Sequence, residues 1–163
     1  MKKQQGITFV EILMALAILG IVTAFSFPSF KAMIDTSSVS SVSSNLISSL
    51  SYARLEAIRR GDFVMISTSN GSNNWSDTNR VWLDSDNNNA FNTNNDEVLR
   101  LIENKNDDIT VSSNGISSIA FRADGFINSP ATFTICHSDE AIGRRIELLI
   151  SGRVSVDDNH ACR

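Results

Sequence analysis

The chain has few of the residues and motifs that enzymes and nucleic-acid binders use. Its 163 residues include only two cysteines and two histidines, and the sequence contains no Walker loop, zinc-ligand spacing or nucleophile elbow. Lys and Arg number 14 against 18 Asp and Glu, so the formal charge is −4 and the chain as a whole lacks the basic excess of a nucleic-acid binder. We therefore predict no enzyme, no metal site and no cofactor, while a local basic patch stays open.

The few cysteines and histidines lack the neighbours that catalysis requires. His137 follows Cys136, but adjacent strand residues point to opposite faces and cannot share a proton. His160 is interpreted as a solvated tail residue. Cys136 and Cys162 form an even pair, which is typical of one disulfide in an oxidising compartment. Two free thiols in a reducing cytosol are the alternative.

What the chain does have is a long apolar segment near its N-terminus. The 21 residues from Ile7 to Phe27 precede Pro28 and carry a single charge, Glu11. As a helix the segment would be about 31 Å long, which matches a membrane hydrocarbon core of about 30 Å. Because Lys2 and Lys3 precede it, we expect the N-terminus in the cytoplasm and the rest of the chain outside.

Glu11 distinguishes three interpretations of this segment. A secretory signal cleaved after Ala24-Phe25-Ser26 would have a shorter apolar region and no use for a carboxylate. A plain membrane anchor explains the length but not the charge, whose insertion at a helix centre costs roughly 2.5 to 3.5 kcal/mol. Cleavage between Gly6 and Ile7 would instead create an α-amine about 6 Å from Glu11 along the helix axis. The carboxylate would then neutralise this amine or that of a neighbouring helix, which would set the register of an assembly.

The stretch KKQQGITFVEILMALAILGIV resembles the leader and first helix of type IV pilins and type II secretion pseudopilins. The resemblance implies that a prepilin peptidase cuts after Gly6 and methylates the new N-terminus, Ile7, where the family usually has Phe. It also implies a proline 22 residues into the mature chain, where Pro28 stands. Glu11 and Pro28 are therefore expected to serve assembly. The protein is expected in the bacterial inner membrane, with a periplasmic head, before it joins a pilus or pseudopilus.

Beyond Pro28 the apolar residues recur at steps of three and four, which predicts an amphipathic half of the helix over residues 28–60. Serine is frequent in this stretch, but a sheet that covers the apolar face would outweigh its modest cost in helix propensity. Gly61 is the predicted end of the helix. The apolar face consists of Val39, Val42, Leu46, Leu50, Ala53 and Ala57.

Residues 61–163 carry short β-type runs between turn residues and predict a β-rich head. The expected fold is α+β: a leader (1–6), a transmembrane and assembly half of the helix (7–27), and an amphipathic half (28–60) packed on one face of an antiparallel sheet. The β-type runs are Phe63–Thr68, Arg80–Leu83, Glu97–Ile102, Ile109–Ser112, Ile116–Arg122, Thr132–Cys136, Arg145–Ile150 and Arg153–Val156.

The head segments NRVWLDSDNNNAFNTNNDEVLRLI, IAFRADGFI, FTICHS and GRRIELLISGRVSV resemble successive parts of the GspH/FimT family of minor pilins and pseudopilins. The resemblance implies a type IV pilin-like fold and a structural subunit that primes assembly or forms the tip of a type IV pilus, with other pilin subunits as partners. The Cys136 and Cys162 pair resembles the type IV minor pilins of this family more than its type II secretion members. A type II secretion pseudopilin remains the alternative.

Arg144, Arg145 and Arg153 are candidate DNA-binding residues, because the resemblance to the FimT branch implies DNA capture through C-terminal Gly-Arg-x-Arg motifs. Arg144 follows Gly143 and Arg153 follows Gly152, but the second arginine of the motif is missing after Arg153 and two aspartates come soon after. Solvated strand ends are the alternative interpretation.

The segment DSDNNNAFNTNNDE at residues 84–97 places Asp84, Asp86 and Asn88 at alternating positions, as calcium loops do. An EF-hand loop needs Gly at its sixth position and Glu at its twelfth, where this chain has Asn89 and Asn95. We therefore interpret the segment as a polar hairpin loop.

Overall fold

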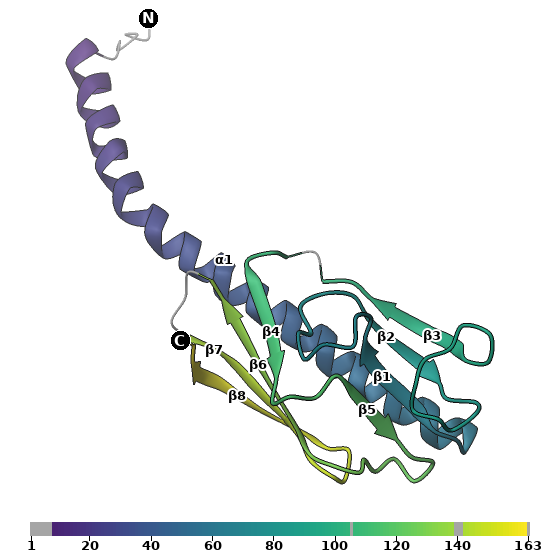
Figure 1. The fold of residues 1–163 in the computed structure, drawn as a ribbon. Coiled ribbons are helices and arrows are strands. Elements are labelled where there is room, and N and C mark those ends of the chain that lie inside the picture. Colours follow the sequence, from purple (N-terminus) through teal and green to yellow (C-terminus); the bar gives the residue numbers. More distant parts are fainter. Residues whose placement is uncertain (1–7, 105, 139–141, 163) are drawn as a thin grey trace, which may run out of the picture. The chain divides into compact units, whose positions relative to one another are not determined.

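The computed structural model describes residues 8–104, 106–138 and 142–162, and for residues 24–29 and 142 it describes the backbone alone. Within these ranges the chain forms a long helix, α1 (Phe9–Arg60), followed by eight strands (Figure 1). The chain divides into two compact units, Met1–Asp35 and Thr36–Arg163. The first unit contains the N-terminal half of α1, and the second contains the remainder of α1 and all the strands.

Local hydrogen bonds fix both ends of α1. At the start, the backbone N–H of Glu11 donates to the carbonyl and hydroxyl oxygens of Thr8, at 3.1 and 3.3 Å. Thr8 thus caps the first turn, where backbone N–H groups have no helical acceptor. The helix ends at Arg60, as the sequence predicts, because Gly61 adopts a left-handed conformation with φ of 70°. The Gly61 N–H then bonds the carbonyl oxygen of Ala57 at 2.9 Å.

The second half of α1 packs its predicted apolar face on the strands. Two serines, Ser43 and Ser49, are fully buried on the same helix segment, and the Ser49 hydroxyl donates to the Asn45 carbonyl oxygen at 2.8 Å. The serine-rich stretch is therefore part of the core face rather than a linker, because its small side chains let the sheets approach the helix. The larger buried residues are Val39, Leu46, Leu50, Ala53 and Ala57, with Val42 packed partly against them.

The strands form two four-stranded antiparallel sheets, whereas the sequence analysis expected one. The first sheet has the order β3 (Glu97–Ile102), β2 (Asn79–Leu83), β1 (Val64–Thr68), β5 (Ser118–Phe121). The second has the order β4 (Ile109–Ser113), β6 (Ala131–His137), β7 (Ile142–Leu148), β8 (Val154–Ala161). Since β4 joins the second sheet while β5 returns to the first, the two sheets alternate along the chain and no local pattern reveals the division.

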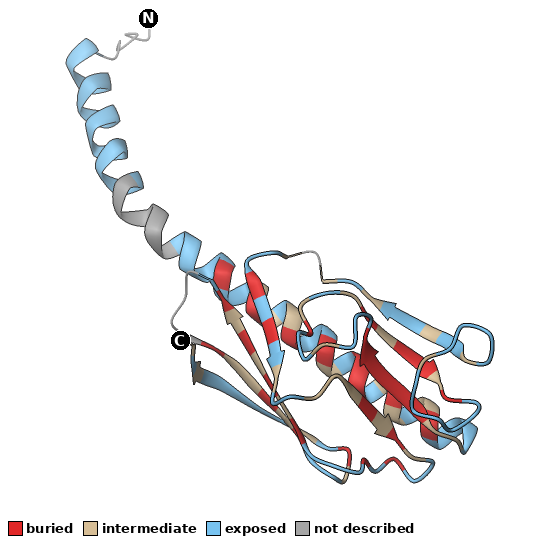
Figure 2. Ribbon diagram, in the orientation of Figure 1, coloured by how far each residue is buried: buried red, intermediate tan, exposed pale blue. Residues whose placement is uncertain are grey.

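Side chains from both sheets and from the second half of α1 form the core, which Figure 2 shows as buried residues along the strands and one helix face. Trp75 and Phe133 meet edge to face with ring centroids 5.0 Å apart, and the Trp75 indole N–H donates to the Ile116 carbonyl oxygen at 2.7 Å. All five residues of β1 are buried, so this strand is covered on both of its faces.

The last two strands differ most from their predicted ranges. β7 begins at Ile142 and ends at Leu148, because a turn follows in which the Gly152 N–H bonds the Leu149 carbonyl oxygen at 2.8 Å. β8 continues to Ala161 because its backbone pairs with β7. Its last residues are mostly polar, so the sequence pattern did not predict this extension. His160 therefore lies in a strand opposite Gly143, and its interpretation as a tail residue was wrong.

Candidate functional site

Glu11, the charge within the apolar segment, lies in the first turn of α1 and is exposed. Within the described part of the chain, no side chain bonds its carboxylate. Gly6 and Ile7 lie outside the described residues, and of Pro28 only the backbone is described, within α1. The cleavage position and the pairing of Glu11 with an α-amine therefore stay predictions.

The helix around Glu11 is apolar on every side. A helix of this kind needs an apolar environment or partner helices, because water would otherwise contact its whole circumference. Among the residues that the structure describes, no helix is both long and apolar enough to cross a membrane. The exposed apolar residues of this half include Phe9, Val10, Ile12, Leu13, Met14, Leu16, Ile18, Leu19, Ile21 and Val22.

Cys136 and Cys162 form a disulfide, as predicted, with their Cα atoms 5.8 Å apart. The bond links β6 to the end of the chain across a separation of 26 residues. Closing a loop of this length stabilises a fold by about 3.5 kcal/mol in the chain-entropy model. Gly143 of β7 lies against the bond: a Cβ there would be 2.5 Å from the sulfur of Cys162 and 2.2 Å from the carbonyl oxygen of Ile135. Only glycine fits at this position.

The three candidate DNA-binding arginines differ in their partners. Arg144 and Arg145 are neighbours in β7, where the pairing with β8 is irregular between Gly143 and Arg145. Arg144 bonds Asp158 at 2.8 Å and Arg145 bonds Glu147 at 2.9 Å. Arg153 follows the turn at the other end of β7 and is exposed. Two of the three guanidinium groups are thus already paired with carboxylates.

Sequence reasoning missed Arg54, which joins the helix to two turns of the head. Its Nε donates to the Gly125 carbonyl oxygen at 3.0 Å. Gly125 and Gly152 both have positive φ, of 77° and 71°, and a Cβ on Gly152 would be 2.3 Å from that carbonyl oxygen. The turn after β5 and the turn after β7 therefore meet beside Arg54. Both turns are recognisable from their glycines, but nothing in the sequence marks Arg54 as different from a surface arginine.

The acidic segment between β2 and β3 forms a polar hairpin loop, as the sequence analysis interpreted it. The carboxylate of Asp84 is buried and accepts hydrogen bonds from the backbone N–H groups of Asn88 and Asn89, at 3.2 and 2.9 Å. Carboxylate oxygens of Asp84, Asp86 and Asp96 lie within 4.8 Å of one another. Asp96 stands one position beyond the twelfth of an EF-hand, so the calcium pattern did not identify it. Backbone N–H groups satisfy Asp84, which accounts for its burial without a bound ion.

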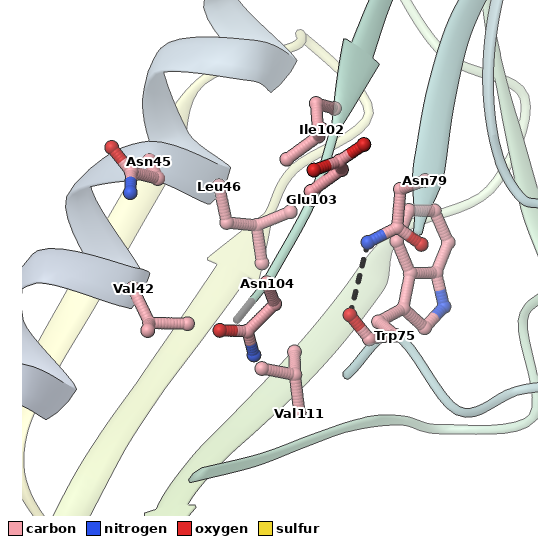
Figure 3. A pocket seen from close by; sticks show the side chains of 9 residues that line it. All are labelled: Val42, Asn45, Leu46, Trp75, Asn79, Ile102, Glu103, Asn104 and Val111. Atoms are coloured by element: carbon pink, nitrogen blue, oxygen red, sulfur yellow. Dashed lines mark hydrogen bonds between the residues drawn. The ribbon is translucent and has the colours of Figure 1, made fainter. Parts of the chain in front are cut away.

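A small cavity of about 30 Å³ lies between α1 and the strands (Figure 3). Asn79 donates through Nδ2 to the Trp75 carbonyl oxygen at 2.9 Å. Among the described residues, Oδ1 of Asn79 and Nδ2 of Asn104 have no partner. Since one water needs about 10 to 15 Å³ of such volume, the space suits one or two waters rather than an organic substrate. None of the predicted site residues lines it. The lining residues are Val42, Asn45, Leu46, Trp75, Asn79, Ile102, Glu103, Asn104 and Val111.

Comparison with known proteins agrees with this arrangement. Two crystal structures of the type IV minor pilin FimU from Pseudomonas aeruginosa are similar to the chain, with TM-scores of 0.60 and 0.58 and 19% sequence identity in both. The matches cover 73% and 72% of this chain, and 87% and 91% of the FimU chains. At this identity the likeness shows the fold: a type IV pilin-like long helix on antiparallel sheets. No curated protein sequence matches the chain.

Two family profiles match different parts of the sequence. The profile described as prokaryotic N-terminal methylation motif matches residues 1–27, which contain the apolar segment and Glu11. The profile described as type II transport protein GspH matches residues 43–152, which is more than half of the chain and includes most of the head. The chain therefore belongs to the GspH family of minor type IV pilins and pseudopilins.

Proposed function

We propose that the protein is a minor pilin that primes assembly or forms the tip of a type IV pilus. A prepilin peptidase would cut after Gly6 and methylate Ile7. Residues 7–27 would hold the protein in the inner membrane, N-terminus inside and head in the periplasm, until it joins the filament with other pilin subunits. The observation that carries this proposal is the first half of α1, where apolar side chains are exposed on all sides around one exposed carboxylate.

The chemistry of Glu11 supports a role in assembly rather than in folding. Its position in the first turn of α1 places the negative charge near the positive end of the helix dipole, which tolerates it there. In an apolar assembly an isolated carboxylate is costly, so pairing with a free α-amine of a neighbouring subunit would stabilise one stagger of the helices over others. The surrounding apolar side chains would then pack against those of adjacent helices.

The test uses full-length Glu11→Ala in its own host, with Ile18→Ala as the matched control on the same exposed helix surface. We expect Glu11→Ala to insert in the membrane and fold normally but to be lost from sheared filaments, whereas Ile18→Ala is retained. Intact mass of the membrane form should give a methylated start at Ile7. A start at Phe27 would remove the pilin interpretation, and normal incorporation of Glu11→Ala would contradict the pairing with an amine.

A type II secretion pseudopilin is the second candidate, favoured by the description of the family profile that matches the head. Deletion of the gene distinguishes the two, because a pilus subunit affects surface filaments and a pseudopilin affects export of folded proteins. DNA capture has less support, since Arg144 and Arg145 are paired with Asp158 and Glu147.

A further inference from the structure

Two arginines of the head stand apart from the rest. Each other arginine that the structure describes in the head bonds a carboxylate or lies over an aromatic ring; these are Arg59, Arg60, Arg80, Arg100, Arg122, Arg144 and Arg145. Arg54 bonds only a backbone carbonyl, through Nε. The side chain of Arg153 bonds no part of the chain that the structure describes; only its backbone carbonyl is engaged, by the N–H of Leu149. Both side chains line the same groove.

This groove has a volume of about 360 Å³ and lies between the last turns of α1 and the start of β8. Its apolar wall comes from Leu55 and Ile58, which are 64% and 47% exposed although they lie on a helix that is otherwise packed on the sheets. No acidic side chain is among the described residues that line it. Among the described residues, nothing neutralises the two positive charges that the groove presents beside its exposed apolar surface.

The walls of the groove are fixed before anything binds. Arg54 holds the turn at Gly125, and the turn at Gly152 fits against the same carbonyl oxygen without room for a Cβ. A preformed site of this kind loses little conformational entropy on binding, because its backbone is already in place. The charge also stays available, since the only bond that Arg54 makes leaves its two Nη groups without partners in the described structure.

We propose that this groove docks an acidic segment of a neighbouring filament subunit, with a carboxylate between Arg54 and Arg153 and an apolar side chain on Leu55 and Ile58. The inference rests on the proposed function, which supplies the neighbouring subunit. Guanidinium groups bind carboxylates with charge-assisted hydrogen bonds, often bidentate. A nucleic-acid backbone would satisfy the arginines but has no group to cover the apolar wall, and the groove offers no aromatic ring for stacking of bases. The composition therefore favours a protein segment.

The experiment places the photo-crosslinker p-benzoylphenylalanine at Leu55 of the full-length protein in its own host. Leu101 of β3, which is 60% exposed, is the matched control site. Crosslinked products are recovered from sheared filaments and membranes and identified by mass spectrometry. We expect Leu55, and not Leu101, to crosslink to a peptide of another pilin subunit that contains Asp or Glu.

Charge reversal identifies the contribution of the arginine. Arg153→Glu should lower the crosslinking yield at Leu55 at least tenfold, and changing the identified acidic residue of the partner to Arg should restore it. Arg145→Glu, a reversal on β7 outside the groove, should leave the yield unchanged. Arg153 is preferred to Arg54 because Arg54 also holds the turn at Gly125, so its loss could disturb the fold.

The remaining outcomes separate this inference from the function on which it rests. A nuclease-sensitive or lipid adduct at Leu55, an unchanged yield in Arg153→Glu, or no adduct from a protein that is present in filaments would overturn the docking site and leave the filament role intact. Absence of the unmodified protein from filaments that otherwise assemble would overturn the proposed function, and the docking site with it.

Discussion

The two halves of α1 carry their apolar side chains in opposite ways. In the first unit they are exposed around the whole helix, as in Phe9, which is 75% exposed. In the second unit one face is buried against the sheets, where Leu50 is 1% exposed. The second half is therefore stabilised by its own head, whereas within the described part of its own unit the first half has nothing that covers its apolar side chains.

Two glutamates, one in each half, differ in a similar way. Glu56, near the end of α1, bonds Arg59 and Arg60 at 2.6 and 2.9 Å. The hydrogen bonds from Arg59 and Arg60 lower the pKa of Glu56 below its ordinary value. Glu11 has no such side-chain partner among the described residues. Glu56 is thus satisfied by side chains of its own helix, whereas no described side chain bonds Glu11.

We expect the largest difference in stability when a leucine of each half is truncated to alanine. Leu50→Ala should lower the free energy of unfolding of the head by roughly 3 to 5 kcal/mol, because it removes a fully buried side chain and leaves a cavity. Leu16→Ala, at a position 58% exposed, should change it by less than about 0.5 kcal/mol. Urea unfolding of the purified full-length variants, followed by Trp fluorescence, measures both. Equal destabilisation by the two changes would contradict the contrast between the halves.

The sequence predicted the parts of this fold that depend on short-range patterns. The apolar face from Val39 to Ala57 repeats with helical period, and Gly61 supplies the end of the helix, so the packed half of α1 was found correctly. The range of β3 was predicted without error, because a turn-rich loop and a polar segment bound it. The disulfide between Cys136 and Cys162 was predicted from an even cysteine pair in a chain with an export-type N-terminus, and it is confirmed.

What the sequence could not predict depends on contacts between distant segments. The division into two sheets arises because β5 pairs with β1, although three other strands lie between them in the sequence. The sequence of a β-type run does not indicate which strand it pairs with. The extension of β8 through Asp157 depends on pairing with β7. Arg54 was missed for the same reason: its importance comes from two turns that lie far from it in the chain.

A smaller loss of stability should come from changes in the turn at Gly152, which packs beside Arg54 of α1. It tests whether this turn, as well as the sheets, stabilises the packed half of the helix. Gly152→Ala should cost roughly 3 kcal/mol, because it adds steric overlap with the Gly125 carbonyl oxygen to the strain of a positive φ. Gly71→Ala is the matched control: its φ is 72°, yet a Cβ would meet nothing within 4 Å, so strain alone should cost about 1 kcal/mol. Equal losses in urea unfolding would mean that the contact with Gly125 contributes nothing.

The smallest effect concerns pH and compares Glu56 with Glu11. Because the pKa of Glu56 is lowered in the folded protein, its ionised form stabilises the fold above the ordinary value of 4.5, and this contribution is lost as the pH falls below that value. Ion pairs three or four residues apart on a helix contribute about 0.3 to 0.5 kcal/mol each. Glu56→Gln should therefore reduce the free energy of unfolding slightly at pH 7, and the difference from the unmodified protein should disappear as the pH drops from 5 to about 3.

Glu11→Gln provides the control, since Glu11 is exposed in the first unit and has no described side-chain partner whose loss would alter the head. It should leave the unfolding free energy unchanged across the same pH range. The measurement is a series of urea titrations of the full-length variants between pH 3 and pH 7 at low salt, where such pairs are least screened. A pH-dependent loss in Glu11→Gln as large as that in Glu56→Gln would show that the carboxylate of Glu11 also stabilises the fold, and would remove the distinction between these two glutamates.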